Sequence, residues 1–280
     1  MSTFQAVVYG IVYGFSEFLP ISSAAHSALV AQITGWPQPA ELLQGYFALG
    51  ALLAIFFYFI HDWASMISSF LSVVLFRKKP MTLDERMPFF LMIATLPPVA
   101  AWYYLKDGMP EQLTDPLWMI AGLVLFSLLL ALGEYMSRKN KGMFDWNWID
   151  AFIIGVFQIL MLVPACGRSL GALSGGMLRN YNREAIAKVS FFAAAPLLAG
   201  SAWLHLRGFG AHPAATLPEG TSWITVGVAL MATTLTALLV LGGFMKQIAR
   251  KNLNTYGAYR VMLAMVFGLV LVARTKGWLH

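Results

Sequence analysis

Two long apolar stretches of this chain are each interrupted in the middle by a short polar segment that contains a proline. The first interruption runs from Glu17 to His26 and the second from Pro164 to Ser169, at corresponding places in the two halves of the sequence. A charged side chain at the centre of a bilayer costs at least about 2.5–3.5 kcal/mol, and a proline removes a helical N–H donor. Both segments are therefore predicted to be unwound, re-entrant turns whose charged groups face protein or water.

The composition indicates an integral membrane protein. Of the 280 residues, 59% are hydrophobic and 11% are charged, against roughly 25% charged residues in an average soluble domain. No long polar linker divides the sequence, so 1–280 is predicted to be a single membrane domain. Met1–Tyr13 lacks the basic start of a cleavable signal and is expected to belong to the fold. Cys166 is the only cysteine, which excludes an intramolecular disulfide and a cysteine metal cluster.

The apolar segments predict an all-α fold with six membrane spans and two re-entrant helical hairpins. A span needs about 20 apolar residues. The hairpins are expected at 4–34 and 149–180, where the polar segments break the apolar runs. The amphipathic piece Trp63–Phe76 is expected at the membrane interface. The predicted spans are 45–60, 87–105, 117–134, 185–205, 223–244 and 257–273.

Basic residues set the predicted orientation. They gather at 77–86, 138–141 and 246–251, and loops rich in Lys and Arg stay in the cytoplasm. Loops 106–116 and 207–222 alternate with them and are expected outside. This order opens the first hairpin to the outside and the second to the inside. The net charge of +6 fits such loops, so no nucleic-acid partner is expected.

Opposite openings of two related hairpins are typical of an inverted repeat, here predicted as 1–134 and 149–280. Pro20 aligns with Pro164 at a constant offset that other apolar positions share. Chance similarity between apolar segments is the alternative interpretation. If the repeat holds, both hairpin tips meet near the middle of the membrane. The residues joined there would be Glu17, Ser22, Ser23 and His26 from one tip and Arg168 and Ser169 from the other.

Those residue types favour phosphoryl transfer. The planar fork of Arg168 suits phosphate oxygens, and glycines such as Gly167 let backbone approach a ligand closely. Ser23 and His26 offer a nucleophile and a base. Glu17 could orient the histidine, protonate a leaving group or hold a divalent metal. For Ser22 and Ser169, a hydrogen bond to a neighbouring helix is an equally favoured role.

A second polar group lies near the ends of predicted spans. It consists of Arg183, Lys188, Tyr259 and Arg260. Basic residues at such places most often anchor a helix at the membrane surface, and interfacial anchoring is the favoured interpretation for this group.

The run from Gly14 to His26, GFSEFLPISSAAH, resembles the first signature of the bacterial undecaprenyl-diphosphate phosphatases, the bacitracin-resistance family. Phe157-Gln158 and Pro164–Ser169 look like its second signature region. The resemblance implies six spans with two re-entrant helix pairs, in the bacterial inner membrane. It also implies hydrolysis of undecaprenyl diphosphate to the monophosphate carrier of peptidoglycan synthesis, at a site open to the periplasmic side. Divalent Mg²⁺ or Ca²⁺ is the implied cofactor.

Carried across by the resemblance, Glu17, Ser23, His26 and Arg168 fall on catalytic positions, with Ser23 or His26 as nucleophile. Substrate binding is assigned to Tyr13, Ser22, Gly167 and Ser169, and a metal ligand to Glu17. The chain also departs from the family pattern. An acid or glutamine expected four positions before Glu17 is Tyr13, a glycine after Pro164 is Ala165, and a serine before Arg168 is Gly167. A metal site built on paired carboxylates is therefore doubtful.

Two further functions stay open at this point. The same inverted repeat could move undecaprenyl phosphate or another anionic lipid between leaflets without cleaving it, as a transporter or flippase. A channel is the weaker alternative, because the sequence lacks a ring of repeated carbonyl or carboxylate elements. The expected partners are a polyprenyl diphosphate lipid and the membrane. The sequence leaves the oligomeric state open, and a homodimer is one option.

Overall fold

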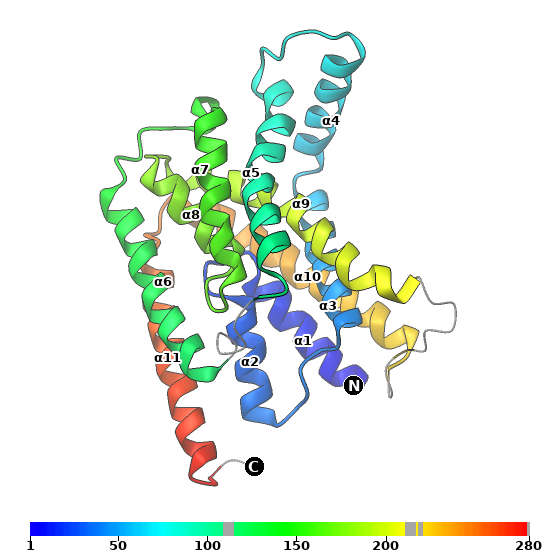
Figure 1. Cartoon of the computed structure of the whole chain (residues 1–280), viewed down its shortest axis with the longest axis vertical. Helices are drawn as coiled ribbons and strands as arrows, with labels where there is room; N and C mark the ends of the chain where they lie inside the picture. The colour runs from blue at the N-terminus through cyan, green and yellow to red at the C-terminus, as the bar shows by residue number, and fades with distance from the viewer. Residues whose placement is uncertain (109–114, 211–216, 218–220, 279–280) are drawn as a thin grey trace.

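The chain is helical throughout the part that the computed structural model describes, which comprises residues 1–108, 115–210, 217 and 221–278. Figure 1 shows the arrangement of the helices. Two short 3₁₀ helices, η2 (Met143–Asp145) and η3 (Ile159–Leu162), join the α-helices. The α-helices are α1 (Thr3–Ser16), α2 (Ser23–Thr34), α3 (Glu41–Tyr58), α4 (Ile60–Leu75), α5 (Leu83–Leu105), α6 (Pro116–Met136), α7 (Trp148–Gln158), α8 (Arg168–Leu178), α9 (Arg183–Gly210), α10 (Trp223–Ile248) and α11 (Asn254–Thr275).

Within the described residues, six helices are long and apolar enough to cross a membrane, as predicted: α3, α5, α6, α9, α10 and α11. Their ends follow local capping rules. The Thr82 hydroxyl accepts from the Glu85 N–H at the start of α5, while the Glu85 side chain reaches back to the Thr82 N–H. The Asp115 side chain caps α6, which has proline at its first position. The predicted outer loops 106–116 and 207–222 lie largely outside the described residues.

The two polar interruptions each separate a pair of short helices. α1 has 14 residues and α2 has 12, and α7 and α8 have 11 each, so none reaches the length of about 20 residues that a span needs. Pro20 and Pro164 lie in the connecting turns. Since proline has no N–H to donate, each turn lacks one backbone hydrogen bond that a continuous helix would make at that residue.

The helix pairs pack in a regular order. α1 lies against α10, α7 lies against α5, and α6 runs beside α11 at the lower left of Figure 1. α9 packs on α3 and is the most buried span, with 72% of its apolar window inside the molecule. α9 is therefore the central helix, and the apolar side chains exposed on the other spans face lipid.

Two glycines allow close contacts between a short helix and a spanning helix. A Cβ on Gly10 of α1 would lie 2.8 Å from the carbonyl oxygen of Ala229 on α10. A Cβ on Gly155 of α7 would lie 2.6 Å from the carbonyl oxygen of Ala94 on α5. Both distances are shorter than a real Cβ contact, so each short helix rests directly on the backbone of a spanning helix, as small residues permit in membrane proteins.

Buried ion pairs fix the end of the molecule where α9 begins. Asp150 of α7 is fully buried and accepts from Lys141, Arg179 and Tyr181 at 3.0, 2.5 and 2.7 Å. Glu134 of α6, also buried, is held by Arg183.

The interfacial anchor predicted for Arg183 stays a prediction, and the structure adds a tertiary contact, because a buried carboxylate binds its guanidinium. Lys188 likewise pairs with Asp62, with its Nζ 2.6 Å from Oδ1. Both cations therefore serve tertiary structure.

The close contacts of Gly10 and Gly155 predict matched effects of substitution. Gly10→Ala and Gly155→Ala should each lower the free energy of unfolding by about 1–3 kcal/mol, because the added methyl group forces two backbones apart. Thermal unfolding in detergent measures this. Gly227→Ala on α10 is the control, since a Cβ there meets nothing within 4 Å. It should be neutral or stabilise the helix by up to about 1 kcal/mol. Equal effects at the three positions would contradict the packing described.

Candidate active site

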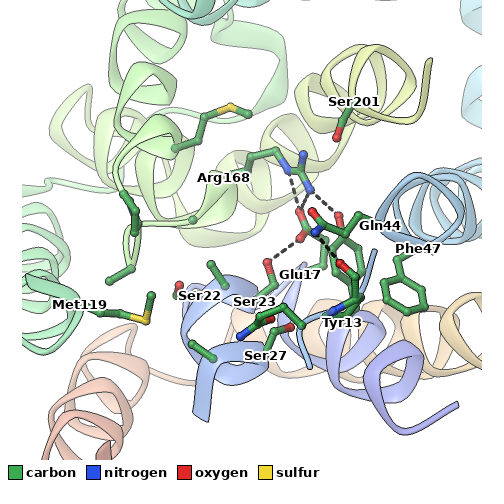
Figure 2. Close-up of a pocket in the computed structure, with 18 of the residues that line it drawn as sticks. Tyr13, Glu17, Ser22, Ser23, Ser27, Gln44, Phe47, Met119, Arg168 and Ser201 are labelled. Atoms are coloured by element: carbon green, nitrogen blue, oxygen red, sulfur yellow. Dashed lines mark hydrogen bonds and ion pairs between the residues drawn. The ribbon is translucent and has the colours of Figure 1, made fainter. Parts of the chain in front are cut away.

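The two turns between the short helices meet at a cavity of about 600 Å³. Figure 2 shows its lining, which α2, α3 and the two turns supply together with single residues of α1, η3, α6, α8 and α9. Its polar lining residues are Tyr13, Glu17, Ser22, Ser23, Ser27, Gln38, Gln44, Arg168 and Ser201. Residues from both halves of the sequence thus share one cavity.

A buried ion pair joins the two turns across this cavity. Glu17 follows the last residue of α1, and Arg168 is the first residue of α8. Nε of Arg168 donates to Oε1 of Glu17 at 2.6 Å, and Nη2 contacts the same oxygen and the Tyr13 hydroxyl, the latter at 2.9 Å. The side chains are only 4% and 11% exposed. In such surroundings neither charge is stable without the other.

Ser23 completes a chain of hydrogen bonds with this pair. Its hydroxyl donates to Oε2 of Glu17 at 2.9 Å, so the two carboxylate oxygens bind different partners. Figure 2 shows Ser23, Glu17 and Arg168 in that order. A carboxylate that accepts a serine O–H bond is placed to take its proton when the oxygen attacks. The arginine meanwhile fixes the carboxylate's orientation.

Two helices begin at the same point. Ser22 precedes α2 with φ of +73°, and Gly167 precedes α8 with φ of +81°. A Cβ on Gly167 would lie 3.4 Å from Cα of Ser22. Because the first turn of a helix carries unpaired N–H groups and partial positive charge, two such ends together favour an anion.

The hydroxyls of Ser22 and Ser169 have structural partners. The Ser22 oxygen accepts from the Ala25 N–H at 3.3 Å and caps α2. Ser169 donates to the backbone carbonyl of Glu17 at 2.9 Å, which ties α8 to the first turn. Both therefore hold the geometry of the two tips in place.

His26 lies beside the cavity. Its Nδ1 is 2.7 Å from the Ser22 carbonyl oxygen and its Nε2 is 2.8 Å from the Tyr259 hydroxyl. The two rings stack with an interplanar angle of 5°. Since a carbonyl only accepts, Nδ1 carries the proton, and a neutral ring accepts from the Tyr259 hydroxyl. His26 is not among the described residues that line the cavity, so the structure brings Glu17 and Arg168 together without it.

Several cavity residues could not be found by inspecting the polar interruptions. Gln44 of α3 and Ser201 of α9 lie within apolar spans, and Ser27 lies one turn after Ser23 on α2. The only signal in the sequence was an amide and a hydroxyl near the ends of predicted spans. Such residues are common in membrane helices.

Arg260 corrects a prediction. Interfacial anchoring was expected for Tyr259 and Arg260, but Arg260 is 0% exposed. Its guanidinium binds backbone carbonyls of both turns, and Tyr259 binds His26. The start of α11 therefore supports the site from behind, because both residues point into the protein.

The donor set does not fit a divalent cation held by protein oxygens. Glu17 is the only carboxylate lining the cavity among the described residues, and both its oxygens accept hydrogen bonds. Nor does the described part of the chain contain a group of three or more His, Cys, Asp or Glu side chains placed to bind a metal. Mg²⁺ and Ca²⁺ need about six or more oxygen ligands, so the protein would supply only a small share of them.

The comparison with known families agrees with this geometry. The model of the family described as bacitracin resistance protein BacA matches residues 6–266. The chain belongs to this family. Relatives named undecaprenyl-diphosphatase from Thermobifida fusca and Chlorobaculum parvum are each 29% identical to it. They align over 98% and 95% of this chain and over 91% and 95% of their own lengths. A relative of the same name from Bifidobacterium adolescentis is also 29% identical, over the whole chain.

Two residues that the resemblance marks as departures from the family signature have visible structural roles. The Tyr13 hydroxyl accepts from the Arg168 guanidinium. Ala165 has φ of +71°, a conformation that favours glycine. The first change keeps a partner for Arg168 without adding a second carboxylate.

The Glu17–Arg168 pair predicts strong coupling between the two positions. Glu17→Gln and Arg168→Met should each lower the free energy of unfolding by about 3–5 kcal/mol, because each leaves a buried charge unpaired. The double variant should lose much less than the sum of the two. Thermal unfolding of the four proteins in detergent gives the coupling. Asp107→Asn, which breaks an exposed pair with Lys106, is the control and should change stability by at most about 1 kcal/mol. Additive effects at 17 and 168 would contradict a direct buried pair.

Proposed function

We propose that this protein hydrolyses polyprenyl diphosphate to the monophosphate, with undecaprenyl diphosphate as the natural substrate. The reaction would recycle the lipid carrier of peptidoglycan synthesis and so bear on bacitracin resistance. The observation that carries the proposal is the chain Ser23–Glu17–Arg168 at the meeting point of two helix N-termini. Relatives that align with nearly the whole chain carry the name of this activity.

The geometry supports a two-step reaction. Oγ of Ser23 attacks the terminal phosphorus while its proton passes to Oε2 of Glu17, 2.9 Å away. The bond from that phosphorus to the bridging oxygen breaks, and the lipid monophosphate leaves. Water then attacks the phosphoserine, the proton held by Glu17 returns to Oγ of Ser23 as its bond to phosphorus breaks, and inorganic phosphate leaves with the two protons of the water. The positive ends of α2 and α8 and the Arg168 guanidinium stabilise the charge on the transferred group.

A histidine nucleophile is the second route to the same products. Nε2 of His26 is bound to the Tyr259 hydroxyl and would have to turn toward the cavity before attacking. The serine route needs no such rotation and is the one we favour. Tyr13, Gly167, Ser22 and Ser169 would shape the phosphate site through backbone geometry and through contacts to Arg168 and Glu17.

In this proposal, a divalent cation binds to the site only together with the substrate. Glu17 is engaged on both oxygens, so a bound Mg²⁺ or Ca²⁺ would take most of its ligands from the diphosphate and from water. When bound there, it would neutralise phosphate charge.

The packing supports an inverted repeat of 1–134 and 149–280 with re-entrant hairpins at α1–α2 and α7–α8. The pair α1–α10 corresponds to the pair α7–α5, and both use a glycine 145 positions apart in the sequence, Gly10 and Gly155. The contacts α3–α9 and α6–α11 each join corresponding helices of the two halves. In Figure 1 the α1–α2 pair lies below the α7–α8 pair, and their turns meet between them.

The cavity lies toward the end of the molecule where α2 ends and α3 begins, since Gln38, Pro39 and Gln44 line it. The basic segments 77–86, 138–141 and 246–251 lie at the opposite ends of their helices. With these segments in the cytoplasm, the site would open to the periplasmic side of the bacterial inner membrane.

A second hollow favours one alternative, transport of a lipid phosphate between leaflets. It has a volume of about 470 Å³, lies where α9 begins, and is lined by Asp62, Asp84 and Lys188. Aromatic side chains of Phe18, Phe59 and Phe191 pack between the helices that bear the two hollows. Hollows at both ends of a repeat with an internal barrier suit alternating access.

Phosphate release by the purified protein tests the proposal. Inorganic phosphate should be released from C15 and C55 diphosphates, and the assay is run with and without a chelator. Ser23→Ala and Glu17→Gln should lower kcat by about 10²–10⁴-fold, because each removes the nucleophile or its base. Ser68→Ala, on the exposed side of α4, is the matched control. If Ser23 attacks the phosphorus, the His26→Ala variant should keep measurable activity. If His26 attacks it, the same variant should have none.

No phosphate release with any divalent cation would refute the hydrolytic function. Transfer of polyprenyl phosphate between leaflets of proteoliposomes would then support the transporter, and its absence would refute that alternative as well.

A further inference from the structure

Arg260 of α11 connects both turns from the side opposite the cavity. Its Nη2 donates to the Ala165 carbonyl oxygen at 2.6 Å, and its Nη1 lies 3.4 Å from the carbonyl oxygens of Pro20 and Cys166. Nε donates to the Ser127 hydroxyl of α6 at 3.3 Å. Pro20 belongs to the first turn, and Ala165 and Cys166 belong to the second. One fully buried guanidinium therefore holds the backbone of both tips.

This cation has no carboxylate partner within ion-pair distance in the described ranges. Buried carboxylates elsewhere in the fold, including Glu17, Glu134 and Asp150, are paired with other cations. An unpaired buried charge costs several kcal/mol, and the four oxygen acceptors around Arg260 offset only part of that cost. A buried charge with so little compensation would be stabilised by an anion bound nearby.

The net charge of the two tips indicates what the unpaired charge of Arg260 contributes to the site. Glu17 and Arg168 neutralise each other, and the two partners of His26 can both be satisfied by a neutral ring. The charge of Arg260 is left over, directly behind Ala165, which lines the cavity. Without Arg260 the tips would be neutral overall, and with it they carry one net positive charge in a poorly solvated interior, where such a charge acts strongly.

We propose that Arg260 is a positioning residue that supplies this net charge, and that it makes the site prefer a diphosphate to a monophosphate. The inference rests on the proposed function and names the feature of the substrate that the site recognises. A diphosphate carries more negative charge than the monophosphate product and gains more from the same cation. The product is consequently held less tightly than the substrate, which favours its release.

Binding of inorganic diphosphate and inorganic phosphate to the purified protein tests the inference without depending on turnover. Arg260→Gln keeps N–H donors but removes the charge, whereas Arg260→Lys keeps the charge with fewer donors. Arg260→Gln should weaken diphosphate binding by about tenfold, equivalent to about 1.4 kcal/mol, and phosphate binding by less. Arg260→Lys should keep the preference for diphosphate even if its thermal stability falls. Ser127→Ala, which removes one bond to Arg260 but no charge, should also keep it.

Three outcomes would overturn the inference. Arg260→Gln could keep the preference for diphosphate, Arg260→Lys could lose it, or Arg260→Gln could weaken both anions equally, as a purely structural role would. If Arg260→Gln does not fold, the comparison of Arg260→Lys with the wild type still decides. Failure of the proposed function is distinguishable, because a protein that does not hydrolyse lipid diphosphates would release no phosphate from them yet could show the Arg260-dependent preference.

Discussion

The buried pair between Glu17 and Arg168 is the interaction on which the rest of the site depends. It joins the end of α1 to the start of α8, two elements about 150 residues apart in sequence. Because each charge would be unstable alone in this interior, the pair requires both turns to be present and in register. Ser23, Tyr13 and Ser169 all attach to one member of the pair or to its backbone.

The spanning helices make that meeting possible through small residues. Gly10 and Gly155 let α1 and α7 lie directly on α10 and α5, which brings two short helices toward the middle of the molecule. At the other end, Asp150 and Glu134 bind Arg179 and Arg183 and fix where α8 ends and α9 starts. Ion pairs therefore hold the ends of the second hairpin, while close backbone packing sets how far the hairpin reaches into the molecule.

Much of this architecture could be predicted from the sequence. The six spans and the two breaks followed from apolar length and from the prolines, because a bilayer makes both requirements strict. The side-chain partners could not be predicted. His26 turns to Tyr259, and Arg260 is buried behind both tips instead of anchoring α11. Periodicity shows that a residue lies near the end of a helix, but not whether that end faces lipid or another turn.

Three residues at the tips have positive φ, and two of them, Ser22 and Ala165, are not glycine. Such a conformation costs of order 1–3 kcal/mol and persists only where surrounding contacts impose it. In either half of the chain alone, the opposite tip would be missing, and the strained backbone would relax to an ordinary conformation. Its N–H groups would then point elsewhere. The site is thus a joint product of the two halves, since each half supplies only one of the two helix N-termini that face the cavity.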